Sequence, residues 1–194
     1  IKSDPKIYYH LLFENEFLDS DDIIVIGRLF VKFKKIKNKL SSFVRRYKWK
    51  KSVLYSCNSD LYLNDLDGFK DKYKITILEN NTRYRFRLSN IINYWEESLT
   101  NSSGLFTKPV HLTNPYTNLK ISTHNLYNIY FKLLNTGFDL PLSIKAFFTS
   151  NMNIDDFSFK YYPMLKEKAK ENFIRKKGLI YEKWEQILNM LYEY

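Results

Sequence analysis

The chain has 194 residues, of which 44% are hydrophobic and 18% aromatic, so it is too apolar to be a disordered segment. Its length suits a single compact domain over 1–194, or an N-terminal helical arm at 1–52 followed by an α+β core at 53–194. The net charge of +10 favours acidic partners, and the single cysteine, Cys57, excludes an intrachain disulfide and favours a reducing, intracellular compartment.

The N-terminal part of the chain predicts two helices. The first is short, with Asp4 as its N-cap, Pro5 in its first turn and apolar residues on one face over 7–12. The second begins near Asp21, whose charge suits the positive end of a helix dipole. Its apolar residues recur at three- and four-residue spacing over about seven turns, and we expect this stripe to pack into the core. The stripe consists of Ile26, Leu29, Phe30, Phe33, Ile36, Leu40, Phe43, Val44 and Tyr47.

The positive charge is concentrated on this second helix. Residues 23–59 contain eleven bases and no acid, whereas the rest of the chain carries 20 bases against 21 acids. The helix is therefore predicted to be amphipathic, with a polar face of one sign. The eleven bases are Arg28, Lys32, Lys34, Lys35, Lys37, Lys39, Arg45, Arg46, Lys48, Lys50 and Lys51.

After Ser52 the pattern changes to that of a mixed core. Alternating apolar residues predict a hairpin of strands at 73–77 and 84–88, to which a strand at 53–57 can add, because an isolated hairpin is marginal in water. The fold class is mainly α with a small antiparallel β hairpin or sheet, and with a long basic amphipathic helix near the N-terminus. The later helices are expected over 89–99, from Ser122 or Thr123 to about 133, and over 142–148, 163–176 and 179–192, with an ordered loop at 105–119 and Gly178 between the last two.

No motif for catalysis or metal binding is present. The three histidines and Cys57 lack the spacing of zinc ligands; we expect His124 at a helix cap or on the surface, and Cys57 as a buried structural thiol. The acidic segment 60–71 has an Asp-x-Asp-Gly sequence, but Leu63 and Lys74 occupy the first and closing ligand positions of a calcium loop, which predicts a solvated loop instead. Phosphate-binding glycine patterns and a nucleophile elbow are absent. The sequence predicts a non-enzymatic protein without metal or cofactor.

The basic helix favours a polyanion as partner. Its candidate nucleic-acid-binding residues are the eleven bases together with Trp49, and the excess of lysine over arginine favours nonspecific contact with the phosphates of DNA or RNA. Trp49 and Tyr47 could stack on single-stranded bases, although Tyr47 equally continues the apolar stripe. The alternatives are an acidic protein partner, for a structural or scaffold protein, and a merely solubilising surface. A helix lying on a membrane is disfavoured, because the stripe is needed for the core.

Two further features concern the setting of the chain. The longest apolar runs, such as 23–26, are far shorter than the roughly 18 residues that cross a bilayer, so no membrane span is expected. The chain opens on Ile1 rather than Met, which suggests a processed or trimmed piece of a longer protein that belongs to a larger assembly.

Three stretches resemble a segment of uncharacterised proteins from large nucleocytoplasmic DNA viruses. They are RYRFRLSNIINYWEESL at 83–99, LFTKPVHLTNPYTNLKISTHNLYNIYF at 105–131 and PLSIKAFFTSNMNIDDF at 141–157. The most distinctive part is the turn at 114–118 that leads into the helix at 125–131. The resemblance implies a viral protein of the host cytoplasm or the virion, for which a virion component and a genome-associated protein are equally natural.

Overall fold

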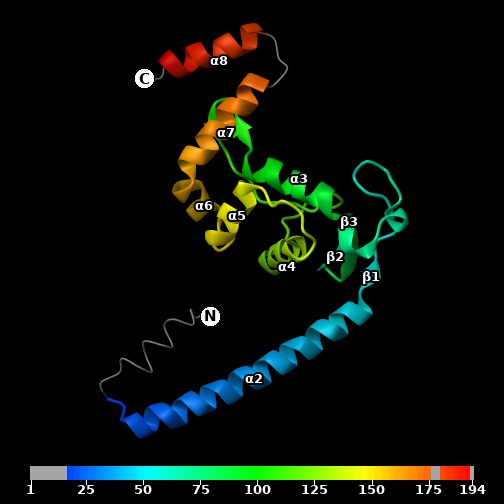
Figure 1. Ribbon diagram of the computed structural model, residues 1–194, viewed down its shortest axis with the longest axis vertical. Coiled ribbons are helices and arrows are strands. Elements are labelled where there is room, and N and C mark those ends of the chain that lie inside the picture. The colour runs from blue at the N-terminus through cyan, green and yellow to red at the C-terminus, as the bar shows by residue number, and fades with distance from the viewer. Residues whose placement is uncertain (1–16, 176–179, 193–194) are drawn as a thin grey trace. The chain divides into compact units, whose positions relative to one another are not determined.

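A computed structural model describes residues 17–175 and 180–192 (Figure 1). The chain divides into two compact units, Ile1–Ser52 and Val53–Tyr194. The short helix expected over 4–12 and the break expected at Gly178 lie outside the described residues. Within them, the protein is mainly helical, as predicted, and it has two small sheets.

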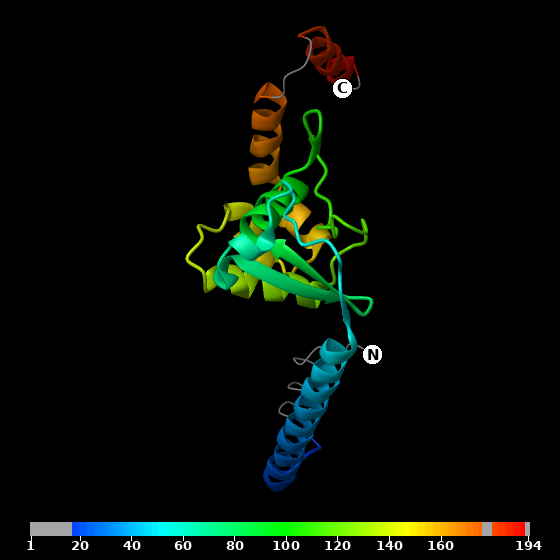
Figure 2. The ribbon, with the colours of Figure 1, turned by 90° about the vertical axis from the view of Figure 1, so that its right-hand side faces the viewer.

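The first unit contains α2, a continuous helix over Ser20–Lys51 (Figure 2). It is 32 residues long, about two turns longer than the apolar stripe alone indicates. Acidic residues occupy its first turn and lysines its last, so both ends suit the helix dipole. The helix ends where Ser52 turns extended, and the Ser52 hydroxyl donates a 2.7 Å hydrogen bond to the Trp49 carbonyl.

The apolar stripe of α2 is not buried. None of the 32 residues of the helix is buried, so the expectation of an inward, packed side was wrong. The physical reason is that helical spacing determines which side chains share a face, whereas burial depends on what other parts of the molecule cover that face.

The second unit begins with a three-stranded sheet. β2 (Lys74–Glu79) and β3 (Thr82–Arg87) form the predicted antiparallel hairpin, and both turn residues, Asn80 and Asn81, have the positive φ angles of a tight hairpin turn. β1 (Val53–Leu54) lies on the other side of β3 and runs parallel to it, so the strand order is β1-β3-β2. The sequence indicated that a third strand can pair with the hairpin, but it did not indicate whether that strand runs parallel or antiparallel.

Helices form most of the remainder. The two short 3-10 helices η1 (Leu66–Gly68) and η2 (Asp71–Tyr73) precede the hairpin. A second hairpin, β4 (Ser102–Ser103) and β5 (Phe106–Thr107), lies partly in the segment expected to be a loop. The α-helices of this unit are α3 (Leu88–Leu99), α4 (Thr123–Leu134), α5 (Leu142–Thr149), α6 (Ile154–Lys160), α7 (Tyr162–Arg175) and α8 (Ile180–Tyr192).

Two of these helices differ from the sequence-based expectation. α3 begins at Leu88, one residue before the expected start, with Arg87 as its N-cap. α6 was not predicted, because it has only seven residues, too few for an apolar period. Its N-cap is Asn153, whose side-chain oxygen accepts a 2.9 Å hydrogen bond from the backbone N–H of Asp155.

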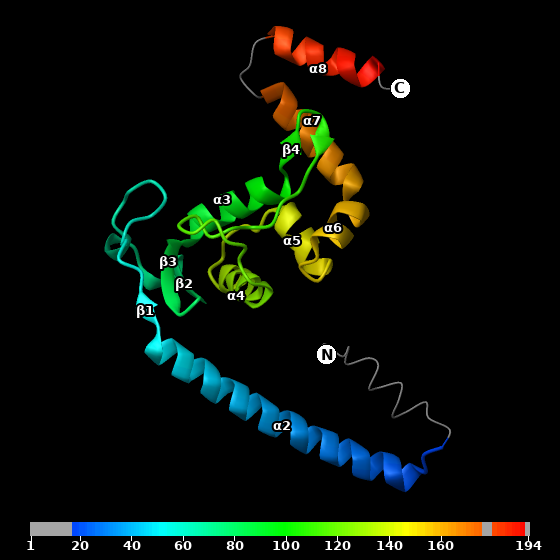
Figure 3. The ribbon, with the colours of Figure 1, turned by 180° about the vertical axis from the view of Figure 1, so that it is seen from behind.

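The core of the second unit lies between the hairpin and the helices. α4 packs against β2, and α5 packs against α3 (Figure 3). The inner face of the hairpin supplies alternate residues of each strand, as its period predicts. Three fully buried aromatic rings, Trp95, Phe147 and Phe157, come from α3, α5 and α6. The Phe147 ring meets Trp95 edge-on at 6.2 Å and Phe157 at 5.4 Å between ring centroids.

Candidate polyanion-binding surface

All eleven bases predicted to bind a polyanion lie on α2, and every one of them is exposed. No ion pair found among the described residues involves any of these bases. A base that is exposed and unpaired can contact a phosphate without first giving up a carboxylate. This combination makes α2 the candidate functional surface.

The bases are not confined to the side of α2 opposite the apolar stripe. Counted in heptads of 3.5 residues per turn with Ile26 at the first position, one group lies on the far side, a second group borders the stripe on both edges, and Lys50 is in line with the stripe near its end. The far group is Arg28, Lys34, Lys35, Arg45 and Lys48; the bordering group is Lys32, Lys37, Lys39, Arg46 and Lys51.

The two aromatic residues among the C-terminal bases lie on different sides of α2. Tyr47 continues the apolar stripe, as its spacing predicted, but its ring is exposed. Trp49 is also exposed and lies off the stripe, between bases of the far group. Of the two, Trp49 is therefore better placed to stack on a base while the neighbouring lysines hold phosphates.

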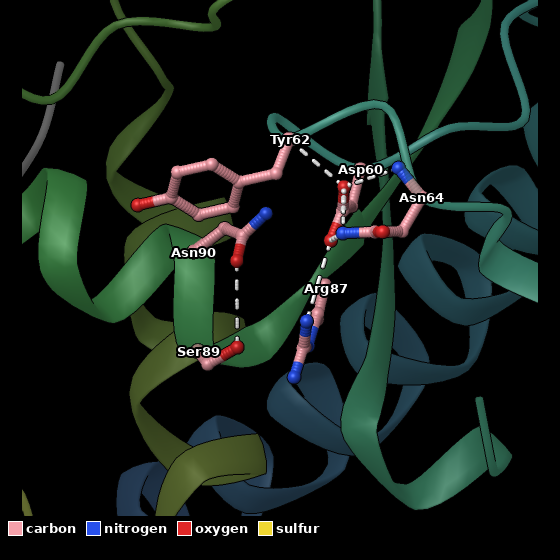
Figure 4. Close-up of polar contacts among 6 residues, drawn as sticks. All are labelled: Asp60, Tyr62, Asn64, Arg87, Ser89 and Asn90. Carbon is pink, nitrogen blue, oxygen red and sulfur yellow. Dashed lines mark hydrogen bonds and ion pairs between the residues drawn. The ribbon is translucent and has the colours of Figure 1, made fainter.

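The second unit contains a polar cluster in which Asp60 is the central residue (Figure 4). One carboxylate oxygen of Asp60 accepts hydrogen bonds of 2.9 Å from the backbone N–H groups of Tyr62 and Asn64, and the other lies 3.4 Å from Arg87 Nη1. Burial is the largest single influence on the pKa of Asp60, and it raises this pKa because it opposes ionisation. The hydrogen bonds from Asn64, Tyr62 and Arg87 together outweigh burial and lower the pKa to about 2. The carboxylate is thus held ionised inside the protein.

Other carboxylates of the acidic loop also have protein partners. Asp67 lies 3.3 Å from Arg85 Nη1, and the Asn58 amide donates hydrogen bonds to Asp65 at 2.9 Å and to Asp67 at 2.7 Å. The loop was expected to be solvated throughout, but Asp60 is buried because it closes the loop onto β3. These ion pairs neutralise Arg85 and Arg87, two of the three arginines of β3.

No hydrogen bond found among the described residues joins Cys57 to His111 or His124. Cys57 is half-buried rather than buried, and its Sγ lies 3.1 Å from the Ser59 hydroxyl, whose hydrogen bonds lower the pKa of the thiol. Burial raises the pKa of the neighbouring Tyr116 to about 12, so this phenol cannot serve as a base near neutral pH. His124 is exposed and lies 3.5 Å from Ser122, the residue that precedes α4, as expected.

The described residues also show no metal or membrane feature. No group of three or more His, Cys, Asp or Glu side chains within 17–175 and 180–192 could hold a metal ion. No helix among the same residues is long and apolar enough to cross a bilayer. An open depression between α3 and α7 is lined by Glu96, Glu97, Lys168 and Arg175, so it presents both signs of charge.

No protein-family model, curated protein or solved structure matches the chain.

Proposed function

We propose that the protein binds nucleic acid nonspecifically through α2 and is not an enzyme. The observation that carries this proposal is the set of eleven exposed bases on one helix, free of ion pairs among the described residues. Each phosphate that such a base neutralises releases condensed counterions, which drives binding without reading sequence.

The dimensions and composition of α2 support contact with the phosphate backbone. A helix of 32 residues is about 48 Å long, which is enough to follow many successive phosphates of a duplex or a single strand. Eight of the eleven bases are lysine, which acts as a point charge, and only three are arginine, the residue suited to bidentate reading of guanine. Affinity should therefore depend on charge and ionic strength and little on base sequence.

Fluorescence anisotropy with labelled DNA and RNA oligonucleotides of unrelated sequence tests this proposal. If the five bases of the far group reach phosphates, the logarithm of the binding constant should fall with the logarithm of salt concentration with a slope of roughly −4. The double variant Lys34→Glu, Lys35→Glu should bind at least about tenfold more weakly than the unmodified chain.

The matched control reverses two exposed lysines of the second unit, Lys145→Glu and Lys166→Glu. This variant has the same net charge as the double variant of α2, so it separates a local surface from overall charge. Absent binding, binding insensitive to salt, or an equal loss in both variants would refute the proposal.

A structural or scaffold protein that docks on an acidic partner is the second candidate. The observation that favours it is the exposed apolar stripe of α2, which contact with phosphates alone leaves uncovered. A pull-down of the full chain distinguishes the two candidates, because nuclease treatment releases partners held by nucleic acid and leaves a direct protein complex intact. In the viral setting that the sequence resemblance implies, these correspond to a genome-associated protein and a virion component.

A further inference from the structure

The apolar stripe of α2 contains a strict heptad pattern. Seven apolar residues follow one another at alternating spacings of three and four, and we call this set the seam. Six of the seven are 56–67% exposed, and the first is half-buried. The seam consists of Ile26, Leu29, Phe33, Ile36, Leu40, Phe43 and Tyr47.

Alternation of three and four is the spacing of the a and d positions in a coiled coil. It differs from the 3.6-residue period of a helix that lies straight on a core, because it averages 3.5 and keeps the seam facing a second helix that winds around the first. With Ile26 at an a position, the pattern holds over three heptads and ends where Lys50 occupies the next d position.

The residues that border the seam indicate the charge of the partner. In this register the g positions are Val25, Lys32, Lys39 and Arg46, and the e positions are Phe30, Lys37, Val44 and Lys51. Five of these eight are basic and none is acidic. Since e and g side chains face the partner helix in a coiled coil, they attract acidic residues there and repel basic ones.

A second copy of α2 fits this pattern poorly. In a parallel pair, Lys32 of one chain would face Lys37 of the other, and Arg46 would face Lys51. In an antiparallel pair, the basic g positions of the two chains would face one another instead. Both arrangements place like charges together along a narrow apolar contact, which opposes self-association.

We propose that α2 forms a heterotypic coiled coil with an acidic α-helix of another protein. The partner helix carries apolar residues at a and d and Asp or Glu at e and g. The seam fills one side of α2, and the far bases Arg28, Lys34, Lys35, Arg45 and Lys48 stay exposed on the other. The coiled coil does not depend on the nucleic-acid proposal, and the two contacts use different sides of one helix.

A designed peptide of about four heptads, with Ile at a, Leu at d and Glu at e and g, serves as the probe. Anisotropy of the labelled peptide should show saturable binding to the full chain, and circular dichroism should show a gain of helix. Two control peptides are compared with it. A scrambled peptide of identical composition keeps the charge but lacks the heptad pattern of apolar residues, and a third peptide keeps that pattern but has Lys at e and g. Both control peptides should bind the chain much more weakly than the acidic peptide.

Variants of α2 then locate the contact. Ile36→Gln with Leu40→Gln removes two seam residues, keeps helix propensity, and should weaken peptide binding by about 100-fold. The matched control Ile24→Gln with Val31→Gln changes two residues that are each 50% exposed and lie off the seam, and it should bind within about threefold of the unmodified chain.

The same variants separate this inference from the proposed function. Seam variants should retain binding to oligonucleotides, and the Lys34→Glu, Lys35→Glu variant should still prefer the acidic peptide to its scrambled form. If only nucleic-acid binding is absent, the nucleic-acid proposal is refuted and the coiled-coil proposal is not. If only peptide binding is absent, the coiled-coil proposal is refuted and the nucleic-acid proposal is not.

Four results would overturn the coiled coil. The first is no binding of the acidic peptide, which includes the case of a seam already covered within the chain. The second is equal binding of the scrambled or the lysine peptide. The third is a homodimer, seen by light scattering, that the seam variant abolishes. The fourth is seam-dependent binding to vesicles of phosphatidylserine and phosphatidylcholine without peptide binding, which identifies the stripe as a lipid-facing surface.

Discussion

Arg87 Nη1 lies 3.4 Å from Asp60 Oδ2, and the Asp60 side chain is inaccessible to solvent while that of Arg87 is 34% exposed. The carboxylate also accepts hydrogen bonds from the backbone N–H groups of Tyr62 and Asn64, so it holds the loop before η1 against β3. Arg87 has a second contact, over the Phe69 ring at 4.3 Å, and therefore keeps a partner if the carboxylate is removed.

Asp60→Ala should destabilise the second unit by about 3 kcal/mol, because it leaves two backbone donors of the loop without their acceptor and removes a charge-assisted hydrogen bond. Urea denaturation followed by tryptophan fluorescence measures the change, since Trp95 lies in the core of this unit. The control is Asp71→Asn, whose fully exposed carboxylate pairs with Lys74, and this variant should be close to the unmodified protein. Equal effects of the two substitutions would show that the buried contact contributes nothing.

The pKa of Asp60 predicts how stability depends on pH. The folded protein holds the pKa at about 2, below its ordinary value of 3.8, so the folded state favours the ionised carboxylate. This contribution is fully present above about pH 4 and is lost as the pH falls toward 2, because the unfolded chain takes up the proton first. The free energy of unfolding should decrease across this window in the unmodified protein and less steeply in Asp60→Asn.

The hairpin turn should respond to substitutions that change its backbone freedom. Asn80 and Asn81 have φ angles of 48° and 61°, a region that glycine adopts without strain and β-branched residues resist. Asn81→Gly should leave stability unchanged or raise it by about 0.5 kcal/mol, whereas Asn81→Val should lower it by about 1–2 kcal/mol. Thermal unfolding compares the two variants, and a neutral valine would contradict the turn geometry.

The aromatic contacts in the core should make Phe147 sensitive to truncation. Its ring lies between Trp95 and Phe157 and is fully buried, so Phe147→Ala should cost about 3–5 kcal/mol through lost burial and the cavity that remains. The control Phe159→Ala removes an exposed ring from α6 and should change stability by less than about 0.5 kcal/mol. Chemical denaturation of both variants measures the difference.

Changes to the seam should not unfold the second unit. None of the residues of α2 is buried, so Ile36→Gln with Leu40→Gln should leave the melting temperature of the second unit within about 2 °C of the unmodified protein. Ile77→Gln, which places an amide in the core of the hairpin, should lower it by far more. A large loss of stability in the seam variant would mean that the stripe supports the fold.

Local patterns in the sequence were sufficient for α2, the hairpin and most of the later helices. Three local signals were enough: the acids at the start and lysines at the end of α2, the alternation in β2 and β3, and the change of pattern after Ser52. Each signal spans only a few residues, and residues close together in the sequence are also close together in space within a helix or a hairpin. Elements too short to show a period, such as α6 and the β4–β5 hairpin, could not be predicted in this way.

The tertiary structure alone decided which charges are paired and which apolar faces are covered. Asp60 and Arg87 are 27 residues apart, and nothing in the local sequence of either indicates the other. The stripe of α2 has the same spacing whether it is buried or exposed, and only the coordinates show it exposed beside bases without carboxylate partners among the described residues. Periodicity specifies the side chains that share a face, but the free energy of that face depends on contacts between segments that are distant along the chain.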